Sequence, residues 1–163
     1  MLLTLNLFPL QFFRPFHRSI QSIVAIILAT VLFSCDTSKL QETPMHGFVG
    51  VWELSGRSMF EGIKVEIKAK KDGGYIGHIV ELNSNKYVTM FAEVGDVWVS
   101  GIERKSNHEF ILKEKKLASP LFSSYGISTT TEYKVEFIDQ ATLGLGSGSS
   151  DPSVSTNVYR RVE

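Results

Sequence analysis

The sequence is poor in three features that would each have pointed to a function. It contains one cysteine in 163 residues, Cys35, which excludes an internal disulfide even if the protein is exported. Its basic and acidic residues balance at 17 each, so it lacks the positive charge that marks a nucleic-acid-binding protein. No unbroken apolar run reaches the ~20 residues that a membrane-spanning helix needs. The clearest run, Ile23–Phe33, has 11.

This short apolar run and the single cysteine together indicate an export signal. Arg14 and Arg18 precede the run, and small Ser34 follows it. The order basic, apolar, small is typical of a secretory signal. The ending Leu32-Phe33-Ser34-Cys35 resembles the lipobox of bacterial lipoproteins, although Phe33 stands where a small residue is usual.

The resemblance implies that residues 1–34 are a signal peptide and that Cys35 is the lipidated first residue of the mature chain. Several acyl chains on one cysteine anchor a protein stably. We therefore expect an exported protein, lipid-anchored to the bacterial cell envelope, at the outer rather than the inner membrane. The alternatives are an ordinary signal peptide cleaved near Ser34 and an uncleaved anchor.

The remaining chain has the size of one small domain. Residues 35–46 are predicted to be the lipidated cysteine and a polar tether, and residues 47–163 a single domain without repeats. Residues 1–34 contain two basic and no acidic side chains, so the rest carries 15 basic and 17 acidic residues, a formal charge of −2. This charge argues against a polybasic lipid-binding surface.

Alternation of apolar and polar residues dominates this domain and predicts strands. Ile63–Lys70 alternates without a fault, Asp72-Gly73 is a hairpin turn signal, and Tyr75–Leu82 is the returning strand. Further strands are expected at 48–55, 87–91, 97–103, 109–113, 130–138, 142–145 and 155–162, with a long connection at 117–126. No segment has convincing helical periodicity.

About eight or nine consecutive strands predict an antiparallel up-and-down meander. A long meander leaves two exposed edges, and closure into a barrel removes them. We therefore predict an all-β fold with a small closed barrel, and a β-sandwich as the alternative.

Two groups of residues near the ends of this domain carry a family resemblance. Gly50 and Trp52 form a Gly-x-Trp opening of the first strand, and Arg160 and Arg161 lie in the last. This pattern resembles the calycins, which include lipocalins, fatty-acid-binding proteins and avidins. The resemblance implies a lipocalin-like barrel whose base is closed by Trp52 beneath Arg160 or Arg161. A guanidinium over an indole face is a favourable cation–π pair.

Two long loops are unusually apolar and predict a ligand rim. The first contains Met59 and Phe60, and the second contains Phe122 and Tyr125. Exposed apolar loops mark binding sites, and Trp98 could line the same pocket or pack outside the barrel. The alternative is that both loops fold back and cap the core.

Motifs that would indicate catalysis, metal binding or phosphate binding are not apparent. His46, His78 and His108 have no ligand-like spacing for a metal. The glycines at 144, 146 and 148 are followed by no helix that could bind phosphate. We therefore predict a monomeric, non-enzymatic protein without cofactor or metal, which binds a small apolar ligand. The alternative is a fully packed barrel that interacts with a protein partner.

Overall fold

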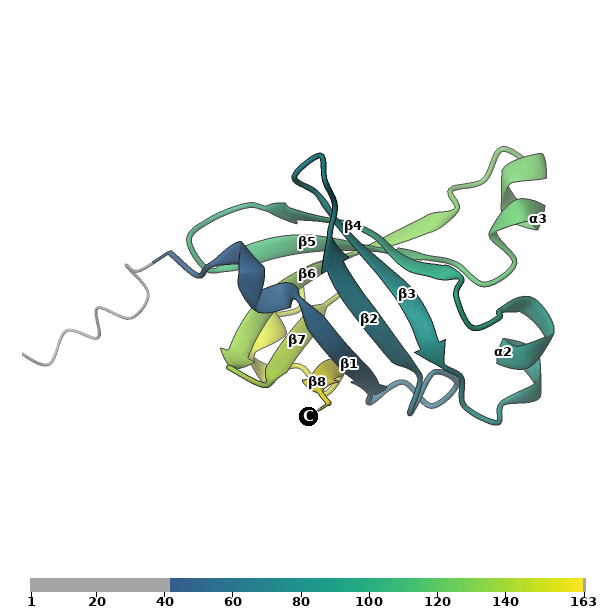
Figure 1. Cartoon of the computed structure of the whole chain (residues 1–163), viewed down its shortest axis with the longest axis horizontal. Coiled ribbons are helices and arrows are strands. Elements are labelled where there is room, and N and C mark those ends of the chain that lie inside the picture. The colour runs from purple at the N-terminus through teal and green to yellow at the C-terminus, as the bar shows by residue number, and fades with distance from the viewer. Residues whose placement is uncertain (1–41, 163) are drawn as a thin grey trace, which may run out of the picture. The chain divides into compact units, whose positions relative to one another are not determined.

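The computed structural model describes residues 42–162, so the predicted signal peptide, Cys35 and the first part of the tether lie outside the described residues. The described chain forms a closed barrel of eight strands (Figure 1). The strands are β1 (Gly50–Ser55), β2 (Lys64–Ala69), β3 (Tyr75–Glu81), β4 (Val97–Arg104), β5 (Glu109–Lys115), β6 (Thr130–Asp139), β7 (Thr142–Gly146) and β8 (Val158–Arg161). None of the helices within residues 42–162 is long and apolar enough to cross a membrane.

Each strand pairs antiparallel with its sequence neighbours, and the first pairs with the last. Trp52 of β1 lies opposite Val65 of β2 on one side and opposite Arg161 of β8 on the other. The closure leaves no sheet edge unpaired around the ring. The predicted all-β, up-and-down closed barrel is confirmed, with eight strands.

The strand expected at 87–91 is wrong, because this segment is the short helix α2 (Lys86–Phe91). The Asn85 side chain accepts a hydrogen bond from the Tyr87 backbone N–H at 3.0 Å and caps the helix. A helical turn then buries Val88 and, four residues later, Ala92 against the core. A strand would have turned Val88 and Met90 to the same face, whereas Met90 is exposed.

Within residues 42–162, three further short helices lie outside the strands. They are the 3-10 helix η2 (Met45–Phe48), the helix α3 (Ser119–Ser124) and the 3-10 helix η3 (Pro152–Val154). The helix α3 lies in the connection expected at 117–126 and has a proline in its first turn, where its missing N–H costs little. The last strand, expected at 155–162, is shorter than predicted because η3 precedes it.

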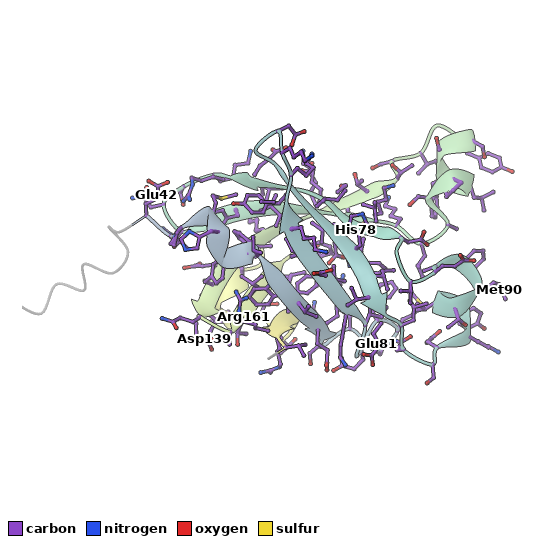
Figure 2. All side chains as sticks on the ribbon, in the orientation of Figure 1. Glu42, His78, Glu81, Met90, Asp139 and Arg161 are labelled. Atoms are coloured by element: carbon purple, nitrogen blue, oxygen red, sulfur yellow. The ribbon has the colours of Figure 1, made fainter. Side chains whose placement is uncertain are left out.

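Every second side chain along the strands points inward and helps to fill the barrel. Buried inward positions include Trp52 and Leu54 of β1 and Phe110 and Leu112 of β5. We call the end that carries η2 and the β2–β3, β4–β5 and β6–β7 turns the base, and the opposite end, with α2, α3 and the β1–β2 loop, the mouth. Figure 2 shows Glu42, Asp139 and Arg161 toward the base and Glu81 and Met90 toward the mouth.

The first described residues lie against the base. Arg104 forms an ion pair with Glu42 at 3.2 Å and donates to the Thr43 carbonyl at 2.6 Å. The Thr43 backbone N–H donates to the Asn107 carbonyl at 2.8 Å. Residues 42–46, which the sequence assigned to the tether, therefore contact the barrel.

Candidate functional site

The base of the barrel is closed by Trp52 and Arg161. The guanidinium carbon of Arg161 lies 4.2 Å from the centre of the fully buried Trp52 ring system. The same guanidinium donates to the carbonyls of Gly47 at 2.5 Å and Val49 at 2.9 Å. Of the two arginines considered from the sequence, Arg161 occupies this place and Arg160 is exposed.

Gly50 makes room for this arginine. Its φ of +141° disfavours other residues, and a Cβ atom there would lie 2.5 Å from Arg161 Nη1. The indole N–H of Trp52 donates to the Phe48 carbonyl at 2.8 Å. The rings of Phe110 and Phe137 lie 4.8 and 4.9 Å from that of Phe48. The base is thus a packed aromatic plug held by one arginine.

A cavity of about 380 Å³ lies beside the plug. Its lining includes His46, Phe137, Asp139 and Arg161. The Arg161 guanidinium already binds backbone carbonyls, so it is not free to bind an anionic ligand strongly.

The mouth holds a second cavity, of about 250 Å³, which brings together four of the five predicted rim residues. Met59 and Phe60 come from the β1–β2 loop, Trp98 from β4 and Phe122 from α3. The Phe60 ring meets that of Trp98 edge-on at 5.2 Å. Tyr125 does not line this cavity, and 75% of its surface is exposed.

Hydrogen bonds fix the loop that carries Met59 and Phe60. The side-chain amide of Asn83 donates to the carbonyls of Met59 and Glu61, at 2.9 Å each. The Glu61 carboxylate accepts from the Ser55 hydroxyl at 2.8 Å and from the Gly56 backbone N–H at 2.7 Å. These four hydrogen bonds hold the apolar loop in place at the cavity.

A buried ion pair forms the floor of the mouth cavity. Arg57 donates to both Glu114 oxygens, at 2.7 and 2.9 Å, and the two side chains are only 13% and 4% exposed. Burial alone lowers the pKa of Arg57, but the hydrogen bonds and charge of Glu114 outweigh it and raise the pKa above its usual value. Arg57 therefore stays charged and occupied by Glu114.

Two further side chains extend this pair into the core. Trp98 donates its indole N–H to the Tyr159 hydroxyl at 2.9 Å, and this hydroxyl donates to Glu114. Burial first, and the charge of Glu114 second, raise the pKa of Tyr159 well above its usual value. Tyr159 therefore remains protonated and continues to donate to the carboxylate.

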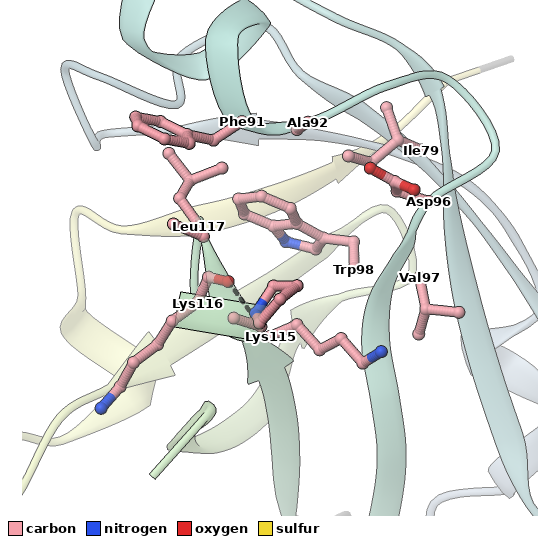
Figure 3. Close-up of a pocket in the computed structure, with 12 residues that line it drawn as sticks. Ile79, Phe91, Ala92, Asp96, Val97, Trp98, Lys115, Lys116 and Leu117 are labelled. Atoms are coloured by element: carbon pink, nitrogen blue, oxygen red, sulfur yellow. Dashed lines mark hydrogen bonds between the residues drawn. The ribbon is translucent and has the colours of Figure 1, made fainter. Parts of the chain in front are cut away.

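A third cavity, of about 200 Å³, adjoins the mouth cavity. It lies between the end of α2 and the start of α3, and it shares Trp98, Lys115, Lys116 and Leu117 with the mouth cavity. Figure 3 shows Leu117 and Phe91 close to the Trp98 ring, with Lys115 and Lys116 extending to opposite sides.

Sequence reasoning missed Arg57, Glu114 and Tyr159 as parts of one site. The alternation could have indicated Glu114, because it is in phase with the buried Phe110 and Leu112 of the same strand. Tyr159 is likewise in phase with Arg161. Arg57 lies in a loop, where no periodicity indicates which way a side chain points.

The other candidates from the sequence do not come together. Within residues 42–162, no group of three or more His, Cys, Asp or Glu side chains could hold a metal ion. Gly144 and Gly146 lie in β7, where a Cβ atom would clash with backbone of the 150–152 segment. Their role in the fold is to let that segment pack closely.

The fold defines the class of this protein as an eight-stranded, antiparallel, up-and-down closed β-barrel. No protein-family model matches the chain, and no curated protein or solved structure matches it significantly.

Proposed function

We propose that this protein is a lipocalin-like binding protein that holds a small apolar molecule at the mouth of its barrel. The observation that carries the proposal is the cavity of about 250 Å³ where Met59, Phe60, Trp98 and Phe122 converge from separate elements. Concave, mostly apolar sites with a few polar groups are the usual form of ligand pockets. The arginine over Trp52 supports the lipocalin-like assignment.

The packed core argues for a ligand at the mouth rather than along the whole barrel axis. Leu54, Leu112 and Val135 are fully buried between the two ends. The Arg57–Glu114 pair then limits the depth of the cavity. The proposed ligand is accordingly small, and the chain needs no catalytic group to bind it.

Anchoring through a lipid on Cys35 is the second part of the proposal, and it rests on the sequence. Radiolabelled palmitate should label the wild-type protein, and Cys35→Ala should abolish the label. Label retained by Cys35→Ala would contradict the lipobox assignment and, with it, the envelope location.

A variant that fills the cavity tests ligand binding. Thr131 lines the cavity, so Thr131→Trp should occupy it, whereas Ile127→Trp places the same side chain at a position that is 51% exposed. The full chain in lipid nanodiscs, titrated with 1-octanol against empty nanodiscs, should bind in the wild type and in Ile127→Trp. Thr131→Trp should bind at least about tenfold more weakly, the equivalent of ~1.4 kcal/mol. Equal binding by all three would contradict the proposal.

The exposed apolar residues around the mouth favour a second candidate, a protein-interaction module. Of the twelve exposed large apolar side chains in the described residues, nine lie in the β1–β2 loop, near the end of β3, or in the segments around α2 and α3. The mouth group includes Met90 at 66% and Tyr125 at 75% exposure. Exposed apolar patches of this kind mark interaction sites. A photo-crosslinker at Tyr125 should then capture one specific protein from intact cells, and the same group at Ile138 should not.

A further inference from the structure

We propose that the ligand of the mouth cavity carries one anionic group and that Lys116 binds it. This inference rests on the proposed function and names the chemical class of its ligand. The class is a compact organic anion, with an apolar body and a carboxylate, sulfate or similar head.

The charges that line the mouth cavity do not cancel. Its lining contains three cations, Arg57, Lys115 and Lys116, and one anion, Glu114. Glu114 is fully engaged by Arg57, which leaves two lysines. Of these, Lys115 is exposed and out of phase with the inward-facing Glu114, so Lys116 is the cation that can face the cavity. Neither lysine forms an ion pair with another described residue, whereas Lys64 and Lys113 on the barrel wall each pair with a glutamate at 2.7 Å.

The geometry directs Lys116 toward the cavity. It follows β5 in phase with the inward-facing Glu114, and its side chain is half-buried. Its ammonium nitrogen lies 5.7 Å from the centre of the Phe122 ring, a cavity-lining residue. A cation over this aromatic wall places positive charge next to apolar surface, as an amphipathic anion requires.

The neighbouring chain supplies no competing carboxylate. Residues 117–131 contain no charged side chain. Glu132, which directly follows this segment, lies 3.6 Å from Lys113 and not beside Lys116. Asp96 lines the adjoining cavity, so an anionic head should prefer the Phe122 side of Leu117.

The floor determines which way the ligand points. Arg57 is occupied by two short hydrogen bonds and is nearly buried, so an anion could reach it only by displacing Glu114 into an apolar core. The head therefore stays at the rim with Lys116, and the apolar body lies against Phe60 and Trp98. A cavity of about 250 Å³ is below the ~300–1,000 Å³ of drug-sized ligand sites, so the body is one short chain or one ring.

Three probes with the same chain and different heads test the inference. Sodium octanoate, 1-octanol and octylamine are titrated at neutral pH into the full chain in zwitterionic lipid nanodiscs, with empty nanodiscs as reference. Hydrogen bonds to charged groups are worth ~1.5–3 kcal/mol, so octanoate should bind at least about tenfold more tightly than octanol, and octylamine more weakly than octanol.

A charge variant assigns the effect to Lys116. Lys116→Gln should remove the preference for octanoate and leave octanol binding unchanged. The matched control, Lys105→Gln, removes a lysine that lines none of the three cavities described above and should keep the preference. Sodium octyl sulfate should behave like octanoate, because charge rather than carboxylate shape is recognised.

The outcomes separate the two proposals. Equal affinity for octanoate and octanol would overturn the anionic ligand and leave the apolar site intact. A preference for octanoate that survives in Lys116→Gln would overturn the role of this lysine. Failure of all the probes to bind the wild type would instead count against the proposed function itself.

Discussion

The base and the mouth of the barrel each place an arginine against aromatic rings, and the two arginines are used differently. At the base, Arg161 lies 4.2 Å from the Trp52 ring centre and binds backbone carbonyls. At the mouth, Arg57 lies 5.3 Å from the rings of Phe60 and Tyr133 and binds a carboxylate. The base arginine ties β8 to the segment that precedes β1, whereas the mouth arginine holds a loop over the core.

The surroundings of the two arginines differ as well. The base buries Phe48, Trp52 and Phe110 completely and leaves Phe137 partly buried beside a cavity of about 380 Å³. The mouth leaves Met90 and Tyr125 exposed, and Phe122 lines its cavity. The larger number of exposed apolar side chains at the mouth supports the proposal that the ligand binds there.

The largest effect should come from removing the plug at the base. Trp52→Ala deletes a fully buried ring and its cation–π partner, and it should lower the free energy of unfolding by about 3–5 kcal/mol. Chemical denaturation of the full chain measures this change. A loss below ~1 kcal/mol would mean that Trp52 does not close the barrel.

Breaking the buried pair at the mouth should cost slightly less. Arg57→Met leaves Glu114 buried without its cation, and we expect a loss of about 3 kcal/mol, because the arginine side chain is 13% exposed. Arg57→Met/Glu114→Leu should recover most of this loss, since no charge then remains buried. A double variant as unstable as the sum of both single variants would contradict the coupling.

Replacing Arg161 of β8 by lysine should lower the free energy of unfolding by a smaller amount. Arg161→Lys loses the planar stacking and two of its hydrogen bonds, so we expect a loss of about 1 kcal/mol. Arg160→Lys, at the exposed neighbouring position, is the matched control and should change stability by less than ~0.5 kcal/mol. Equal effects would remove the distinction between these residues.

The smallest effect should be a pH dependence at the mouth. The folded pKa of Tyr159 lies above its unfolded value of about 10, so its contribution to stability is complete below pH 10 and decreases as the pH rises further. Unfolding measured from pH 8 to 11 should show a steeper loss for the wild type than for Tyr159→Phe. Parallel curves would show that Tyr159 has no raised pKa.

The sequence predicted the barrel because alternation and turn signals are local. The place of Trp52 at the base came from the resemblance to calycins, and in the structure the Arg161 guanidinium lies over its ring. It misassigned 87–91, because a capped helix of six residues is too short to show a period. The Arg57–Glu114 pair joins residues 57 positions apart, and only the closed barrel brings them together.

Hydrogen–deuterium exchange of the full chain in nanodiscs, with and without saturating 1-octanol, tests the division between base and mouth most directly. If the mouth binds and the base only closes the barrel, octanol should slow exchange in residues 56–62 and 114–122 and leave residues 45–52 and 137–142 unchanged. Protection at the base, or equal protection of both ends, would contradict the account.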